Sequence, residues 1–132
     1  PSHGGMKYCV QKLNALYTSQ PALYELQFDP AGFEWIDLQH RSESVMAFKR
    51  KGKNAAEDIV VLINATPVVR HDWKISVQGK QEWQEIFNSD HQDYWGTGVV
   101  YNPYVPCVCM DAQKNWYELT LQLPALSAVV LK

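Results

Sequence analysis

The chain has 132 residues, 46% of them hydrophobic, and a formal net charge of -2. This length suits one domain with a core of its own and excludes a (β/α)₈ barrel, which needs about 250 residues. Because the charge is nearly balanced and basic residues gather only at 49–53, we expect no nucleic-acid partner. No apolar run approaches the roughly 20 residues that cross a bilayer, so we expect no membrane partner either.

The termini and the cysteines indicate the cellular setting. The first residue is Pro1 and the N-terminus lacks the layout of a signal peptide, so we expect a piece trimmed from a longer cytoplasmic protein. Cys9, Cys107 and Cys109 are odd in number, whereas a structural zinc site takes four ligands. We therefore predict reduced thiols, no metal site and no cofactor.

Residues 4–19 are predicted to form one amphipathic helix. Their apolar side chains recur at helical spacing and fall within an arc of roughly 120°. Pro21 follows directly and should end the helix. The apolar stripe consists of Met6, Cys9, Val10, Leu13, Leu16 and Tyr17.

After a turn signal at 29–32, the pattern changes to alternation with period two or to short β-branched runs. Strands without intervening helices indicate a mainly β fold, an antiparallel sandwich or barrel, and we predict the sandwich, preceded by the N-terminal helix. The seven predicted strands are 33–37, 44–50, 59–64, 73–77, 83–88, 116–123 and 128–131.

Two strands and one connection have distinct patterns. Residues 59–63 are apolar throughout and should be central, whereas 116–123 alternate as in a strand with one wet face. Residues 64–72 should connect two strands, with Asn64 and Thr66 bonding local backbone. Asn64 also begins an N-glycosylation acceptor pattern, but that pattern matters only in a secreted chain.

Titratable side chains cluster only at His71-Asp72 and at 90–93. Either cluster could in principle hold a general base or a metal. Neither belongs to a known catalytic motif, since the sequence has no His-Glu-x-x-His helix, no Gly-x-Ser-x-Gly elbow and no phosphate loop. Adjacent residues on a strand point to opposite faces, so His71 and Asp72 should not form a pair in space. We predict solvated loops with local hydrogen bonds and no catalytic residue.

The five tryptophans and seven tyrosines are a stronger hint of function, since flat aromatic rings can pack against the C–H faces of sugars. Trp35 and Trp83 are flanked by strand residues, and we predict that both belong to the core. Tyr94 and Trp95 lie instead in the long, poorly patterned stretch 88–109. They are the predicted substrate-binding residues, as contacts for a glycan.

The chain contains an ordered series of short motifs. They are His3-Gly4-Gly5-Met6, Leu13-Asn14-x-Leu16-Tyr17, Pro21-Ala22-Leu23-Tyr24-Glu25-Leu26, Phe28-Asp29-Pro30-x-Gly32-Phe33-Glu34-Trp35-Ile36, Ser44-Val45, Asn64-x-Thr66-Pro67-Val68 with Arg70-His71, Glu85-x-x-Asn88-x-Asp90 and Leu119-Thr120-Leu121-x-Leu123-Pro124-x-Leu126-Ser127-Ala128. This series resembles the C-terminal end of the bacterial 1,4-α-glucan branching enzymes. The similarity runs over nearly the whole chain, except for Val69, where that family often repeats proline, and for 98–115, where its pattern is richer in glycine.

The resemblance implies a division of the chain. Residues 1–26 would be the last helix of a catalytic barrel layer with its linker, and 27–132 the C-terminal all-β domain of the α-amylase type. The whole enzyme would transfer α-1,4-glucan segments to 6-hydroxyls through a covalent glycosyl intermediate. This part would itself be non-catalytic and would brace its own barrel, and α-glucan such as glycogen is a candidate contact.

Two alternatives stay open at this point. A stand-alone carbohydrate-binding module would need several coplanar exposed aromatic side chains. A protein-interaction domain of immunoglobulin-like shape would need a protein partner that stays bound when excess oligosaccharide is added. In either case the apolar stripe of the helix needs a cover, and self-association of the chain is the expectation.

Overall fold

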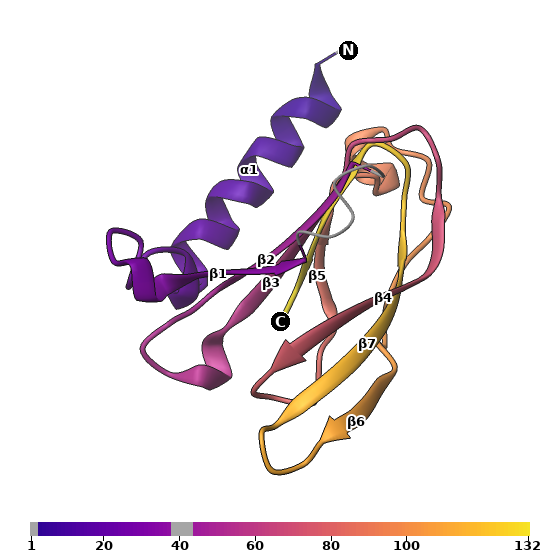
Figure 1. The fold of residues 1–132 in the computed structure, drawn as a ribbon. Coiled ribbons are helices and arrows are strands. Elements are labelled where there is room, and N and C mark those ends of the chain that lie inside the picture. Colours follow the sequence, from indigo (N-terminus) through magenta and orange to yellow (C-terminus); the bar gives the residue numbers. More distant parts are fainter. Residues whose placement is uncertain (1–2, 38–43) are drawn as a thin grey trace.

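The computed structural model describes residues 3–37 and 44–132. One helix, α1 (Gly4–Ser19), runs along the outside of two β-sheets (Figure 1). The predicted helix is confirmed at both ends. It stops because Pro21 opens a short 3₁₀ turn (Pro21–Leu23), while the Gln20 N–H closes the last turn on the Leu16 carbonyl at 2.9 Å.

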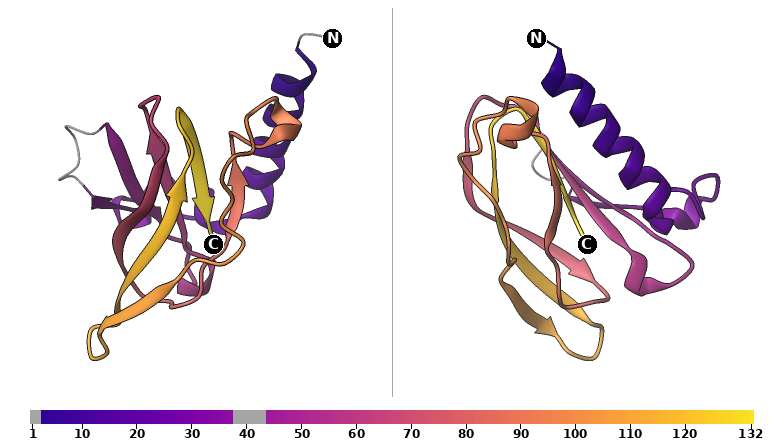
Figure 2. Two further views of the ribbon diagram at one scale, coloured as in Figure 1. Left: turned by 90° about the vertical axis from the view of Figure 1, so that its right-hand side faces the viewer. Right: turned by 180° about the vertical axis from the view of Figure 1, so that it is seen from behind.

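Eight described strands form the two sheets, which pack as the layers of an antiparallel sandwich (Figure 2). The five-stranded sheet has the order β1-β2-β3-β8-β5 and the three-stranded sheet the order β4-β7-β6. The predicted sandwich class is thereby confirmed. The strands are β1 (Phe33–Asp37), β2 (Val45–Arg50), β3 (Ile59–Asn64), β4 (Arg70–Gln78), β5 (Glu85–Asn88), β6 (Cys107–Asp111), β7 (Trp116–Leu123) and β8 (Ser127–Leu131).

The five-stranded sheet is covered on both faces at its centre. In β3, Val60 and Leu62 enter the core between the sheets, whereas Ile59 and Val61 pack on the helix side. This double burial explains why the strand is apolar throughout and confirms its central place. In β7, alternate residues from Leu119 are buried and those between are half-buried, so this strand covers the core as predicted.

The helix uses only part of its apolar stripe against the sheet. Cys9 and Leu16 pack on the cluster that includes Phe87 and Val130. The stripe residues Met6, Val10, Leu13 and Tyr17 are exposed. The stripe therefore has one covered side and one open side.

The two tryptophans predicted to be core residues differ. Trp83 is 4% exposed and belongs to the core, as predicted. The prediction was wrong for Trp35, which is 48% exposed. It lies on β1, an edge strand of the larger sheet, where its ring meets the half-buried rings of Phe33 and Phe48. Flanking strand residues identify a strand, but they do not say whether its outward face is covered.

Asn64 organises the connection after β3. Its amide nitrogen donates to the Val68 carbonyl at 2.8 Å and to the Pro124 carbonyl at 2.9 Å, and its oxygen accepts the Thr66 N–H at 3.1 Å. This confirms the predicted local bonds. Because the amide is buried and fully occupied by these donations, Asn64 is unsuited to glycan attachment.

Candidate functional site

The loop after β5 carries the predicted substrate-binding residues and is held by its own side chains. Asn88 accepts the Asp90 N–H at 2.9 Å, and His91 accepts the Asp93 N–H at 3.1 Å. Asp90 in turn accepts the Thr97 N–H at 3.0 Å. The titratable residues of 90–93 thus make the local hydrogen bonds predicted for them, and together they shape a short 3₁₀ turn, η5 (Gln92–Tyr94).

Trp95 adopts a left-handed backbone conformation directly after η5, with φ of 66°. A bulky residue is rarely found there, and such conformations persist where the surrounding structure holds them. The indole lies on the helix backbone, because a Cβ placed on Gly5 would come 2.8 Å from the ring atoms Cγ and Cδ2. The side chain is nonetheless 61% exposed, which leaves the ring face away from the helix open to solvent.

Tyr94 has a different role from its neighbour. Its half-buried ring stacks on Phe87 with centroids 5.7 Å apart and meets Tyr8 of the helix at 5.5 Å. Burial raises the pKa of the Tyr94 phenol. Tyr94 therefore joins α1 to β5, while Trp95 presents the exposed ring; the left view of Figure 2 shows the short orange turn beside α1.

A second group of aromatic rings lies on the outer face of the larger sheet. Trp35 meets Phe33 at 5.1 Å and Phe48 at 6.1 Å, both edge-on, and Phe33 stacks on Phe48 at 5.2 Å. The sequence pattern did not predict this cluster. Period two places Phe33 and Trp35 on one face, but only the pairing of Trp35 with Phe48 across β1 and β2 brings in the third ring.

His71 and Asp72 are closer in space than the strand alternation predicted. The register of β4 shifts between Arg70 and Trp73, and Asp72 has a positive φ of 52°. This bulge lets both residues reach Gln122: its Oε1 lies 3.0 Å from His71 Nδ1, and its amide donates to Asp72 at 3.2 Å. His71 and Asp72 are exposed and Gln122 is half-buried, so the contacts form a surface tie between β4 and β7.

Glu85 is the centre of a half-buried polar network. Its Oε1 accepts from the Asn102 amide at 3.0 Å and from the Asn88 amide at 3.3 Å. Asn102 also exchanges two hydrogen bonds with the Gln122 backbone, at 2.9 and 2.7 Å. Loss of solvent raises the pKa of the Glu85 carboxyl. The network fastens the long loop before β6 to both sheets.

Within residues 3–37 and 44–132, no three His, Cys, Asp or Glu side chains are placed to hold a metal ion. Cys107 and Cys109 are free thiols on β6, where burial raises the pKa of Cys107. In the same part of the chain no helix is long and apolar enough to cross a membrane.

Residues 35–132 match the family model described as the alpha amylase C-terminal all-beta domain, and the chain belongs to this family. The similarity to curated relatives is narrower than the match to the family model, because these relatives are branching enzymes. The chain is 39% identical over 132 residues to the 1,4-alpha-glucan branching enzyme of Aquifex aeolicus, covering 100% of this chain and 21% of that protein. It is 40% identical over 131 residues to the namesake enzyme of Aromatoleum aromaticum, covering 99% and 20%.

The chain thus spans about a fifth of the length of these relatives. Among solved structures, an alpha-amylase from H. orenii is similar at 23% identity with a TM-score of 0.48, covering 94% of this chain and 19% of that one.

Proposed function

We propose that this chain is the C-terminal part of a cytoplasmic 1,4-α-glucan branching enzyme, in which 1–26 close the barrel layer and 27–132 brace it. The proposal is carried by the sequence identity to two branching enzymes. It is 39% and 40%, and it extends over nearly the whole of this chain and about a fifth of each enzyme. The open side of α1 supports it, because Met6, Val10 and Leu13 are exposed beside a sheet that covers the opposite side of the helix. A neighbouring barrel would bury them.

A chimera tests this function directly. Residues 3–132 replace the matching segment of the Aquifex aeolicus enzyme, and branching is followed by the iodine spectrum of amylose. We expect the chimera to branch, and the isolated chain to leave the spectrum unchanged, since glycosyl transfer needs the carboxylate pair of the barrel. A correctly folded chimera without activity, or turnover that follows the purified chain through fractionation, would contradict the proposal.

We further propose that Trp95 contacts α-glucan, with Tyr94 holding the loop in place. The support is an exposed indole on a turn that is held by local hydrogen bonds, since aromatic faces suit sugar C–H surfaces. Trp95→Ala should weaken retardation of the chain in a glycogen-containing gel while the melting temperature changes little. Phe28→Ala removes another exposed ring, 95% accessible, and serves as the control. Equal retardation of parent and Trp95→Ala would remove the residue from consideration.

A further inference from the structure

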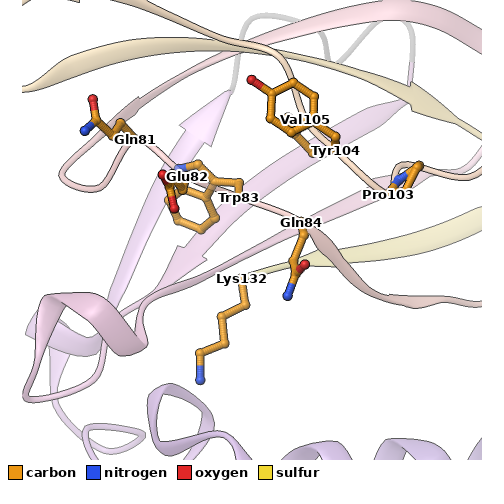
Figure 3. A pocket seen from close by; sticks show the side chains of 8 residues that line it. All are labelled: Gln81, Glu82, Trp83, Gln84, Pro103, Tyr104, Val105 and Lys132. Atoms are coloured by element: carbon orange, nitrogen blue, oxygen red, sulfur yellow. The ribbon is translucent and has the colours of Figure 1, made fainter.

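A hollow of about 500 Å³ lies beyond the C-terminal end of β8, between residues 81–84 and 103–105 (Figure 3). This volume is within the range of small-molecule sites, roughly 300–1,000 Å³. Trp95 lies near the other end of β8. The loop that carries Trp95 is bonded to Ala128, at the start of β8, through Ser89, whereas Lys132, just after the end of β8, lines the hollow. The hollow is therefore a separate place on the surface.

The walls of the hollow combine aromatic rings with polar side chains. Tyr104 is 75% exposed and supplies an open ring, whereas Trp83 is almost buried and forms a floor. Gln81 and Gln84 bring two exposed primary amides, each able to donate and accept. Figure 3 shows these side chains on the two segments that border the hollow.

The charges around the hollow do not select an ion. The Lys132 ammonium is already held by Glu57 at 2.7 Å and by Gln20 at 2.8 Å. The Lys80 ammonium lies 4.3 Å from the centre of the Trp83 ring. Glu82 adds one exposed carboxylate to the lining. A neutral ligand rich in hydroxyl groups fits a wall of amides, one carboxylate and an open ring better than an anion or a cation does.

We propose that the hollow binds a short stretch of α-1,4-glucan, with Tyr104 as the stacking ring and Gln81, Gln84 and Glu82 as hydroxyl partners. The ligand class rests on the proposed branching-enzyme function, while the site itself rests on the hollow's lining.

The test is a titration of the isotope-labelled chain with maltoheptaose, followed through its backbone amide resonances. We expect shifts at 81–84 and 103–105, and a roughly three- to ten-fold weaker affinity at these signals for Tyr104→Ala. Tyr101→Ala is the matched control, because Tyr101 is 61% exposed on the same loop but does not line the hollow. Dispersed spectra of both variants establish that they fold.

The outcomes separate this inference from the proposed function. Shifts confined to 94–97 would overturn the hollow as a glucan site and leave the contact at Trp95 standing. Equal affinity of parent and Tyr104→Ala, or an equal response to cellohexaose, would also overturn the site as stated. The chimera assay decides the branching-enzyme assignment independently, because it requires no binding in the hollow.

Discussion

At the scale of single residues, Asn64 joins the end of β3 to the connection that follows it, at Val68, and to Pro124, which is 60 residues away in the sequence. Asn64→Ala removes the side-chain donor of the Val68 carbonyl and one of the two donors of the buried Pro124 carbonyl, which keeps the Ser127 hydroxyl at 2.7 Å. We expect urea unfolding to show a loss of about 2–3 kcal/mol. Asn54→Ala is the control: it removes one exposed cap, the bond from the Ala56 N–H at 3.0 Å, and should cost about 1 kcal/mol. Equal losses would refute the special role of Asn64.

Glu85 should make the stability of the chain depend on pH. Because burial raises its pKa in the folded state above the ordinary 4.5, the folded chain binds this proton more tightly than the unfolded chain. The free energy of unfolding therefore falls as pH rises from about 4.5 through the folded-state pKa. Glu85→Gln has no carboxyl at this position, so its free energy of unfolding should not fall in this way.

The expected result for Glu85→Gln is a difference in stability, variant minus parent, that grows from pH 4 to pH 8. Chemical unfolding at several pH values measures it. Glu82→Gln, on an exposed neighbouring side chain, controls for the removal of one negative charge. A difference that stays constant over this interval would mean that burial of Glu85 has no net effect on its proton.

At the scale of elements, two adjacent glycines test how α1 docks on the sheet. Alanine is the better helix former, so Gly4→Ala should be neutral or stabilise by up to about 1 kcal/mol, its Cβ lying an ordinary 3.8 Å from Trp95. At Gly5 the same atom would press on Trp95 at 2.8 Å and on the Tyr94 backbone at 3.0 Å. Gly5→Ala should therefore destabilise by about 1–3 kcal/mol.

Thermal melts and tryptophan fluorescence compare the two glycine variants. The fluorescence maximum should move for Gly5→Ala, since the indole must leave the helix, and stay for Gly4→Ala. If both variants stabilise the chain equally, Trp95 does not pack on the helix in solution.

The elements differ in how well the sequence predicts them. Periodicity was sufficient for α1, β3 and β7, where a covered face alternates with an open one or both faces are covered. It missed β6, because Cys107 to Met110 form an edge strand whose apolar residues are largely exposed and give no alternation. It also began β4 at Trp73 rather than Arg70, since the bulge at Asp72 interrupts the period.

Sites were harder to predict than strands for a physical reason. The cluster around Trp35, the packing of Trp95 on Gly5 and the hollow beside Tyr104 each join segments far apart in the chain. Local patterns report which face of a strand is apolar, but not which distant segment covers it. Tyr94 and Trp95 could be singled out as loop aromatics, whereas their separate roles depend on the position of α1.

At the scale of the whole molecule, the open side of α1 should govern association. Met6, Val10, Leu13 and Tyr17 form an exposed apolar surface in the isolated chain, and contiguous patches of this kind tend to become interfaces. Without a barrel to cover them, we expect two copies to cover one another. Sedimentation velocity over a concentration series should show a dimer that forms with rising concentration.

The double variant Val10→Asp, Leu13→Asp should keep the chain monomeric at every concentration, because two charges would have to be buried in the interface. Gln11→Asp, Asn14→Asp is the matched control: it adds the same charge to the same helix at exposed polar positions, and it should dimerise like the parent. Circular dichroism must show an intact helix in all three proteins. A parent that remains monomeric with its helix formed would show that the isolated chain tolerates the open stripe, whereas loss of association in both variants would assign the effect to net charge rather than to the apolar surface.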